Sequence, residues 1–396
     1  MNEWRKVKLR EIGEITSSKR IFRAEYKKVG VPFYRGKEII QKANNQEVSD
    51  EFFISLEKYE EIKNKYSVPL ENDILITSVG TVGIPYIVKN EKFYFKDGNI
   101  NWIKKYANNI YFKYLYYWFI SPIGKNQIDS YLIGSTQKAL TIEAIKKLEI
   151  NLPPLNTQKK IAKILSDIDS KVELNNTINN NLEKQVQLIF NNHFFNKDKN
   201  YTNYISSNLL EIADFLNGLA MQKYTPNDFN EKSYPVLKIK ELNQGFTDKN
   251  SDRCSNKIKS EYIINNGDII FSWSGTLLIK IWCGNKCGLN QHLFKVTSKK
   301  YDKWFYFLWI NYHLKKFISI AKDKATTMGH IKRADLEKAF VLIPPEKEYE
   351  SLNKILTPLF ENIISNKKEN NHLVNLKNYL LPKLMNGEID IENIEL

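Results

Sequence analysis

The sequence predicts a mixed α+β fold, with two globular α/β domains separated by two long antiparallel coiled-coil helices in a pseudo-two-fold internal repeat. Three observations predict this fold. Short motifs recur about 190 residues apart, each half alternates β-rich runs with longer helical runs, and each half ends in Pro-Pro followed by apolar residues at coiled-coil spacing. A chain of 396 residues is also too long for one compact core.

The first repeated motif is a short strand that enters a glycine turn. It occupies residues 72–81 and 267–276, and three residues recur in it 195 positions apart, namely Asp73 with Asp268, Gly80 with Gly275 and Thr81 with Thr276. Each half then has an asparagine-bearing strand, at residues 98–103 and 288–294, and an aromatic helix, at residues 111–120 and 304–314. The helical spacing of these aromatic residues assigns them to core packing rather than base stacking. The pattern leaves open whether the sheets are parallel or antiparallel.

The second repeated motif is a polar loop followed by a proline pair. Ser135-Thr136, Leu140 and Pro153-Pro154 recur 191 positions later as Thr326-Thr327, Ile331 and Pro344-Pro345. Proline suits the first turn of a helix, where its missing N–H is not needed. We therefore expect a first globular domain at 1–152, a long helix at 153–196, a second globular domain at 197–343, and a long helix with a tail at 344–396.

Apolar residues at coiled-coil spacing follow each proline pair, interrupted near the middle by two asparagines. Antiparallel pairing brings the two asparagine layers together, whereas the alternative is that they are exposed positions on helices packed elsewhere. A helix of roughly 30 residues spans about 45 Å, so the two domains could address one face of the same DNA duplex. The residues expected to pair the helices are Leu165, Ile168, Asn175, Asn179 and Leu182 in the first and Leu356, Leu359, Asn366, Asn370 and Leu373 in the second.

The charge balance favours a polyanionic partner. Lys plus Arg number 59 against 45 Asp plus Glu, which gives a formal charge of +14. Nucleic acid ranks first, ahead of an anionic membrane surface or charge that serves solubility. The N-terminal residues lack the apolar core of a secretion signal, and the run at 111–120 is too short to span a membrane, so we expect a cytoplasmic protein without membrane association.

No convincing catalytic or metal site occurs in the sequence. Residues 151–155 only superficially resemble the Asn-Pro-Pro-aromatic motif of adenine methyltransferases, and no phosphate-binding loop is found. Asp335-Leu336-Glu337-Lys338 reads as a solvated helix face. Cys283, Cys287 and His292 lack a fourth zinc ligand, and three cysteines agree with a reducing compartment. We therefore predict no catalytic residue, no metal and no cofactor in this chain.

Candidate DNA contacts are donor, acceptor and cationic side chains on the loops of each half. A solvated turn residue is the alternative for each of them. In the first half they are Lys19, Arg20, Arg23, Arg35, Lys37, Ser78, Thr81, Ser135, Thr136, Gln137 and Lys138. In the second half they are Lys223, Lys238, Lys240, Ser272, Ser274, Thr276, Gln291, Thr326, Thr327, His330 and Lys332.

Three segments carry a resemblance to a known family, namely Leu152-Pro153-Pro154-Leu155-Asn156-Thr157-Gln158-Lys159-Lys160-Ile161, Asn378-Tyr379-Leu380-Leu381-Pro382-Lys383-Leu384-Met385-Asn386-Gly387 and Gly134-Ser135-Thr136-Gln137-Lys138. With them, essentially the whole chain resembles the specificity subunit of type I restriction-modification systems. The resemblance implies two target-recognition domains that each read half of a bipartite DNA site, and two helices that set the spacing.

The same resemblance implies partners that carry the chemistry. Two modification subunits would bind S-adenosylmethionine and methylate adenine, and restriction and translocase subunits, with ATP and Mg, would cut. The second half departs from the pattern, since Ala325-Thr326-Thr327-Met328 replaces Gly-Ser-Thr-Gln and the helix after Pro345 lacks the Gln-Lys pair. The remaining alternatives are a stand-alone DNA methyltransferase or nuclease and a two-domain DNA-binding regulator whose coiled coil only dimerises.

Overall fold

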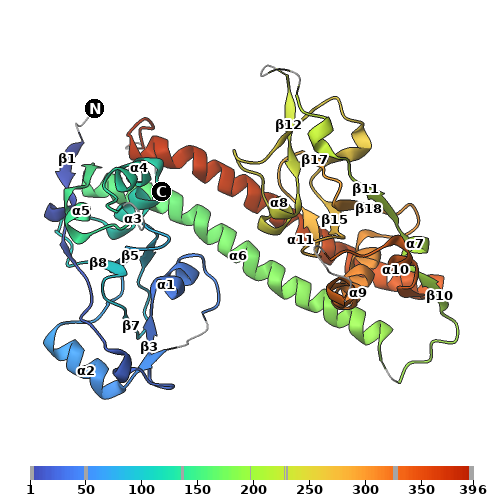
Figure 1. Ribbon diagram of the computed structural model, residues 1–396, viewed down its shortest axis with the longest axis horizontal. Coiled ribbons are helices and arrows are strands. Elements are labelled where there is room, and N and C mark those ends of the chain that lie inside the picture. The colour runs from blue at the N-terminus through green and yellow to red at the C-terminus, as the bar shows by residue number, and fades with distance from the viewer. Residues whose placement is uncertain are drawn as a thin grey trace. The chain divides into compact units, whose positions relative to one another are not determined.

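The computed structural model describes residues 4–48, 52–134, 138–196, 198–226, 228, 231–323 and 329–391. The chain forms two compact units (Figure 1). The first consists of Met1–Asp169 and Asn375–Leu396, and the second of Ser170–Val374. Each unit therefore contains one globular domain, the first part of one long helix and the last part of the other.

The first unit contains three small sheets. Its central sheet is antiparallel, in the order β2 (Glu14–Thr16), β8 (Ile100–Lys104), β5 (Ile74–Thr77) and β6 (Pro85–Ile87). A second sheet has the order β4 (Phe53–Ile54), β3 (Val31–Tyr34) and β7 (Tyr94–Phe95), with β3 and β7 parallel. The third pairs β1 (Arg5–Lys8) with β9 (Glu149–Leu152).

The second unit repeats this topology with one strand added. Its central sheet has the order β11 (Asp214–Asn217), β18 (Leu293–Thr297), β15 (Asp268–Ser272) and β16 (Ile279–Trp282). Its second sheet has the order β13 (Arg253–Ser255), β12 (Ser233–Leu237), β17 (Cys287–Leu289) and the added β14 (Ile263–Ile264). β10 (Ile205–Asn208) pairs with β19 (Phe340–Ile343) as β1 pairs with β9. The predicted internal repeat is confirmed.

The sheet register corrects one predicted correspondence between the halves. Ile74 pairs with Ile103 in the first unit, and its counterpart Ile269 pairs with Val296 in the second. Asn101 is therefore equivalent to Phe294, and not to an asparagine. The predicted strand at 288–294 instead covers the end of β17 and the start of β18.

Shorter helices cover the sheets of each unit. In the first unit they are α1 (Gly36–Ala43), α2 (Leu56–Lys65), α3 (Phe112–Ile120), α4 (Pro122–Ser130) and α5 (Ile142–Lys147), and in the second α7 (Leu209–Ile212), α8 (Ile239–Gln244), α9 (Lys303–Asp323) and α10 (Arg333–Glu337). Most aromatic residues of α3 and α9 are buried, including Trp118 and Trp309, which confirms their assignment to the core, whereas Tyr312 is exposed. Within the described residues, no helix combines the length and apolar character needed to cross a bilayer.

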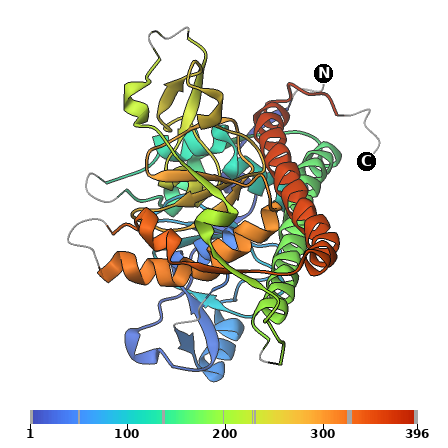
Figure 2. The same cartoon turned by 90° about the vertical axis from the view of Figure 1, so that its right-hand side faces the viewer.

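The two long helices, α6 (Leu155–Phe194) and α11 (Glu346–Met385), contain 40 residues each, ten more than the rough length expected. Figure 2 shows α6 in green and α11 in red. Their ends belong to the globular cores. In the first unit the core includes Leu165 from the start of α6 and Leu384 from the end of α11, and in the second it includes Phe190 from the end of α6 and Leu356 from the start of α11.

Asparagine side chains pair α6 with α11 inside the second unit. The Asn175 Nδ2 atom donates to Asn370 Oδ1 at 2.9 Å and to Glu369 Oε2 at 2.7 Å, and Asn366 Nδ2 donates to Asn179 Oδ1 at 3.0 Å. Residue numbers thus rise along α6 as they fall along α11, which confirms the antiparallel pairing. Asn175 and Asn179 are buried, so the alternative that they are exposed is wrong.

The remaining predicted pairing residues divide between the helix pair and the globular cores. Leu165 and Leu356 are fully buried in the cores, and Leu182 and Leu359 pack against the core of the second unit. Ile168 and Leu373 are half-buried. Most apolar residues of the predicted seam therefore pack in the globular cores, and the middle of the helix pair is polar.

The first turn of each long helix holds the start of the aromatic helix of its own unit. Tyr111 N–H donates to Gln158 Oε1 at 2.9 Å in the first unit, and Asp302 N–H donates to the Tyr349 hydroxyl at 2.9 Å in the second. Tyr111 and Asp302 lie 191 positions apart in the sequence, and so do Gln158 and Tyr349. Tyr349 therefore takes the place of the glutamine that the second helix lacks.

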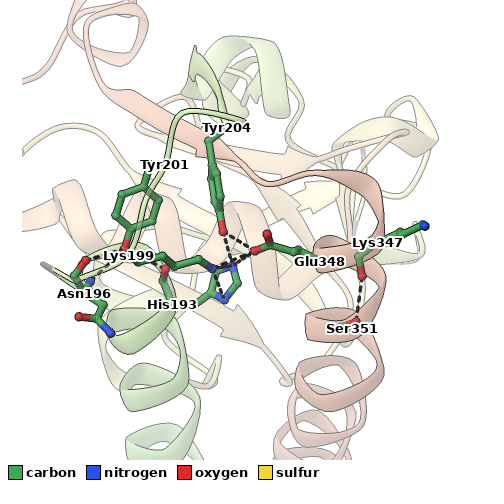
Figure 3. Close-up of polar contacts among 8 residues, drawn as sticks. All are labelled: His193, Asn196, Lys199, Tyr201, Tyr204, Lys347, Glu348 and Ser351. Carbon is green, nitrogen blue, oxygen red and sulfur yellow. Dashed lines mark hydrogen bonds and ion pairs between the residues drawn. The ribbon is translucent and has the colours of Figure 1, made fainter.

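A cluster of polar side chains connects the end of α6 to the start of α11 in the second unit (Figure 3). Glu348 Oε2 lies 2.8 Å from Lys199 Nζ and 2.6 Å from the Tyr204 hydroxyl, which in turn lies 2.9 Å from His193 Nε2. Burial, followed by the charge of Lys199, lowers the pKa of His193. Burial also lowers the pKa of His313, which lies 2.7 Å from the Phe340 carbonyl oxygen.

The asparagine layer predicts a specific pattern of stability changes. Asn179→Leu leaves the Asn366 amide without its partner, so the free energy of unfolding should fall by about 1–3 kcal/mol. Asn179→Leu combined with Asn366→Leu should regain much of this loss because both polar groups are then removed. Urea denaturation of the full chain measures both, with Asn180→Leu at a neighbouring exposed position as the control. Additive losses in the double variant would contradict the pairing.

The half-buried His193 and the buried His313 predict weaker stability in mild acid. Their pKa values are lower in the folded chain than in the unfolded chain, so the unfolded chain binds more protons as the pH falls below about 6.5. The Tm should therefore fall between pH 7.5 and pH 5.5. His193→Gln with His313→Gln should flatten this dependence, whereas His372→Gln, at an exposed position on α11, should not. Equal pH profiles for all three proteins would refute the assignment.

Candidate nucleic-acid interface

The glycine turn after β5 lies against the loop that precedes α5. The Leu140 N–H donates to the Ser78 carbonyl oxygen at 2.9 Å, and Val79 and Ala139 form an antiparallel bridge. Gly80 has a φ of +75°, in the left-handed region that favours glycine. We call residues 78–81 and 138–140 the first turn site.

The second unit builds the same arrangement after β15. The Ile331 N–H donates to the Trp273 carbonyl oxygen at 3.0 Å, and Ser274 and His330 form the equivalent bridge. Gly275 has a φ of +62°, so the turn again needs glycine. We call residues 273–276 and 329–331 the second turn site. The two repeated motifs, far apart in each half of the sequence, therefore come together in space.

Three predicted contact residues lie beneath these turns rather than on them. The Ser78 hydroxyl is buried and donates to the Leu140 carbonyl oxygen at 3.1 Å. The Ser272 hydroxyl is buried and donates to the Ser274 carbonyl oxygen at 3.1 Å, and the buried Ser274 hydroxyl lies 3.1 Å from His292 Nδ1. The Ser78 and Ser272 hydroxyls hold the backbone of the turns and the Ser274 hydroxyl contacts an imidazole, so none of the three belongs to the exposed contact surface.

Cationic side chains lie close to the first turn site. Arg20 forms an ion pair with Asp97 at 3.0 Å, and the neighbouring Gly98 carbonyl oxygen accepts a hydrogen bond from Ser78 at 3.3 Å. Arg20 keeps 69% of its side chain exposed, so it remains available to a phosphate. Lys138 and Thr81 are exposed within the site itself.

Other predicted cations of the first unit lie on separate elements. Lys19 is exposed, with its ammonium 4.9 Å from the Tyr66 ring centre, and Arg23 is exposed at the start of a 3-10 helix. Arg35 precedes α1, where it pairs with Glu38 at 2.8 Å. Lys37 is exposed on α1.

The start of α8 lies next to the second turn site. A methyl group built on Gly275 would lie 3.5 Å from the Ile239 side chain, and Lys238 and Lys240 flank that residue. Lys238 forms an ion pair with Asp252, whereas Lys240 is exposed. Lys238 caps the start of α8, as Arg35 caps the start of α1 in the first unit. A cationic residue therefore recurs at this position of the repeat.

The other predicted contact residues of the second unit differ in location and in exposure. Thr276 is exposed in the turn, Lys332 is exposed directly after the site, and Gln291 is half-buried, with its Nε2 atom 3.3 Å from His292 Nε2. Lys223 is exposed at the end of a 3-10 helix. Five predicted residues lie outside the described part of the chain, namely Ser135, Thr136, Gln137, Thr326 and Thr327.

Sequence reasoning missed Trp273 in the second turn site and His292, which contacts Ser274 of that site. Both are partly exposed, and their ring centres lie 6.0 Å apart. The signal was present in the repeat, since the aligned motifs place Trp273 opposite Ser78. His292 was considered only as a zinc ligand. Among the described residues, no group of three or more His, Cys, Asp or Glu side chains could hold a metal ion.

The three cysteines are packed inside the second unit. Cys254, Cys283 and Cys287 are free and buried, and burial raises the pKa of all three thiols. A methyl group on Gly288 would clash with the Cys254 Sγ atom at 2.5 Å, so the Cys254 side chain fills the space that the absent Gly288 side chain leaves. The thiols are therefore part of the packing of the second sheet.

Comparison with known proteins agrees with the repeated architecture. The family model described as type I restriction modification DNA specificity domain matches residues 1–184 and 201–375. The chain belongs to this family, and the resemblance noted in the sequence is confirmed. The two matched ranges fall in the two halves of the repeat.

Two curated relatives and one solved structure are informative. The chain is 27% identical over 348 residues to the type I restriction enzyme MjaIX specificity subunit of Methanocaldococcus jannaschii, covering 81% of this chain and 78% of that protein. It is 33% identical over 182 residues to the putative type I restriction enzyme specificity subunit S.HindORF215P of Haemophilus influenzae, covering 46% and 43%. The type I restriction-modification S subunit from M. genitalium shares the fold, with a TM-score of 0.60, 15% identity and 96% coverage of both chains.

Proposed function

We propose that this chain is the sequence-recognition subunit of a type I restriction-modification complex and reads a bipartite DNA site with its two turn sites. One observation carries the proposal. A single loop arrangement occurs twice, on two copies of one fold, with different side chains in each copy. Two domains of one fold that read two different half-sites would have this property.

Charge and exposure support DNA as the ligand. The formal charge of the chain is +14, and exposed cations adjoin both turn sites, including Arg20 and Lys138 in the first unit and Lys240 and Lys332 in the second. Cations of this kind neutralise phosphates and orient a protein on the duplex, while neighbouring polar side chains reach the bases. This division of roles fits loops that are held rigidly from below by buried serines.

The chain itself would be non-catalytic. Its sequence lacks a phosphate-binding loop and a methyltransferase motif, and the described carboxylates Asp97 and Asp252 near the turn sites are each paired with a cation. S-adenosylmethionine would bind to two adenine-methylating modification subunits, and ATP and Mg to restriction and translocase subunits. The complex would act in the cytoplasm, on the DNA of the cell.

The long helices would dock the modification subunits and set the length of the unread spacer. Leu174 and Leu188 on α6 and Ile355 on α11 are more than half exposed, at 54%, 60% and 53%. Large apolar side chains at such exposure suit a partner protein better than solvent. A continuous helix of 40 residues is about 60 Å long, so a change in helix length changes the spacing that the protein imposes.

Methylome sequencing of a host that expresses this chain with its modification subunits tests the proposal. The expected result is adenine methylation at one motif with two unlike halves separated by unspecified bases. Adding seven residues to both long helices should lengthen the spacer and leave both halves unchanged. A single uninterrupted motif, or methylation that does not depend on this chain, would overturn the proposal.

Calorimetry of the purified chain with S-adenosylmethionine tests the non-catalytic role separately. We expect no binding by the chain alone and binding once the modification subunits are present. Tight binding without partners would instead favour a stand-alone methyltransferase.

A further inference from the structure

The sheet register makes four positions of the two turn sites equivalent. Because Ile74 and Ile269 occupy the same position in β5 and β15, the residues facing each turn can be matched one by one. The matched pairs are Ser78 with Trp273, Asn99 with His292, Asn101 with Phe294, and Ala139 with His330. Small or polar side chains in the first unit thus correspond to two aromatic side chains, Trp273 and Phe294, and two imidazoles, His292 and His330, in the second.

In the first turn site, Ser78 and Asn101 form hydrogen bonds with the backbone. Ser78 is buried and donates to the Gly98 and Leu140 carbonyl oxygens, and the buried Asn101 Nδ2 atom donates to the same Leu140 oxygen at 2.8 Å. Ala139 has no polar side-chain atom. Ser78, Asn101 and Ala139 therefore offer no free polar group to a base, whereas the partly exposed Asn99 and the exposed Lys138 remain accessible.

In the second turn site the equivalent side chains form a partly exposed ring cluster. The Trp273 ring centre lies 6.0 Å from His292, 6.3 Å from His330 and 5.8 Å from Phe294. Trp273 Nε1–H donates to Asn217 Oδ1 at 3.1 Å. Phe294 in turn packs against Phe215 at 5.8 Å. The cluster is therefore fixed from below by the core and from one side by a hydrogen bond.

An indole that is held in place and remains partly exposed offers a ligand a contact surface that needs little ordering on binding. Its surroundings match those of a base-reading surface. Imidazole nitrogens can donate to or accept from base edges, and an indole face can contact a thymine methyl group. His292 Nε2 would exchange its 3.3 Å contact with the half-buried Gln291 amide for a base edge, while Nδ1 keeps its contact with Ser274. Lys332 and Arg333, both exposed, follow His330 after the buried anchor Ile331 and can reach phosphates.

We propose that Trp273, His292 and His330 read bases of the half-site assigned to the second unit, and that their replacement by Ser78, Asn99 and Ala139 makes the two half-sites unlike. This inference rests on the proposed function of the chain in DNA recognition. The ring cluster is specific to one half-site, so its loss affects one half of the motif only.

Point variants of the full chain, expressed with the modification subunits and read by methylome sequencing, test the assignment. Trp273→Phe, His292→Gln and His330→Gln keep much of the side-chain volume and change the base-facing groups. At least one of them should lower discrimination by roughly tenfold at one or more bases of one half-site. The other half-site should remain unchanged. His372→Gln, an exposed histidine on α11, is the matched control and should retain the full motif.

Three results would decide against the proposal. If all three variants keep the original motif, the ring cluster is only part of the core. If a variant that retains its Tm relaxes both half-sites, or loses methylation at every site, the cluster does not read one half-site. If the unaltered chain yields no two-part motif, the proposed function fails first, and this inference fails with it. A variant with a lowered Tm is set aside, and His330→Gln, which changes a partly exposed side chain, decides alone.

Discussion

The structure depends on the burial of both ends of each long helix in a globular core. In the first unit, Asp169 of α6 accepts a hydrogen bond from Tyr117 of α3 at 2.8 Å and pairs with Lys377 of α11 at 2.6 Å. One carboxylate thus joins both long helices to the aromatic helix. In the second unit, Phe190 and Phe194 of α6 pack around Trp309 of α9. Because core packing tolerates little displacement, the start of each helix is fixed relative to the domain that precedes it.

The middle of the helix pair obeys a different constraint. Asn175 and Asn179 are buried, and a buried amide is costly unless another polar group answers it. In the antiparallel register, Asn370 and Asn366 satisfy them. The polar layer therefore contributes specificity of register more than stability, and the cores at the helix ends supply the apolar packing.

The features that occur in both halves of the sequence were predictable. The roles of positions at which the two halves carry different residues were missed. Glycine turns, proline pairs and asparagine layers recur with fixed spacing, so the two domains and the antiparallel helices were predictable. The equivalence of Gln158 and Tyr349 was hidden because a hydroxyl and an amide oxygen accept the same backbone N–H. Ser78, Ser272 and Ser274 looked like contact residues, because sequence alone does not reveal whether a turn hydroxyl points to solvent or to its own backbone. The domain boundaries drawn from the sequence remain predictions.

The most direct measurement of the central claim exchanges one reading domain. Residues 197–343 are replaced by the corresponding domain of another family member with a different target, and the methylome is sequenced with the same modification subunits. Two independent readers on a common pair of helices predict that one half of the methylated motif changes to that of the donor while the other half stays the same. A motif in which both halves change, or neither changes, would contradict the account.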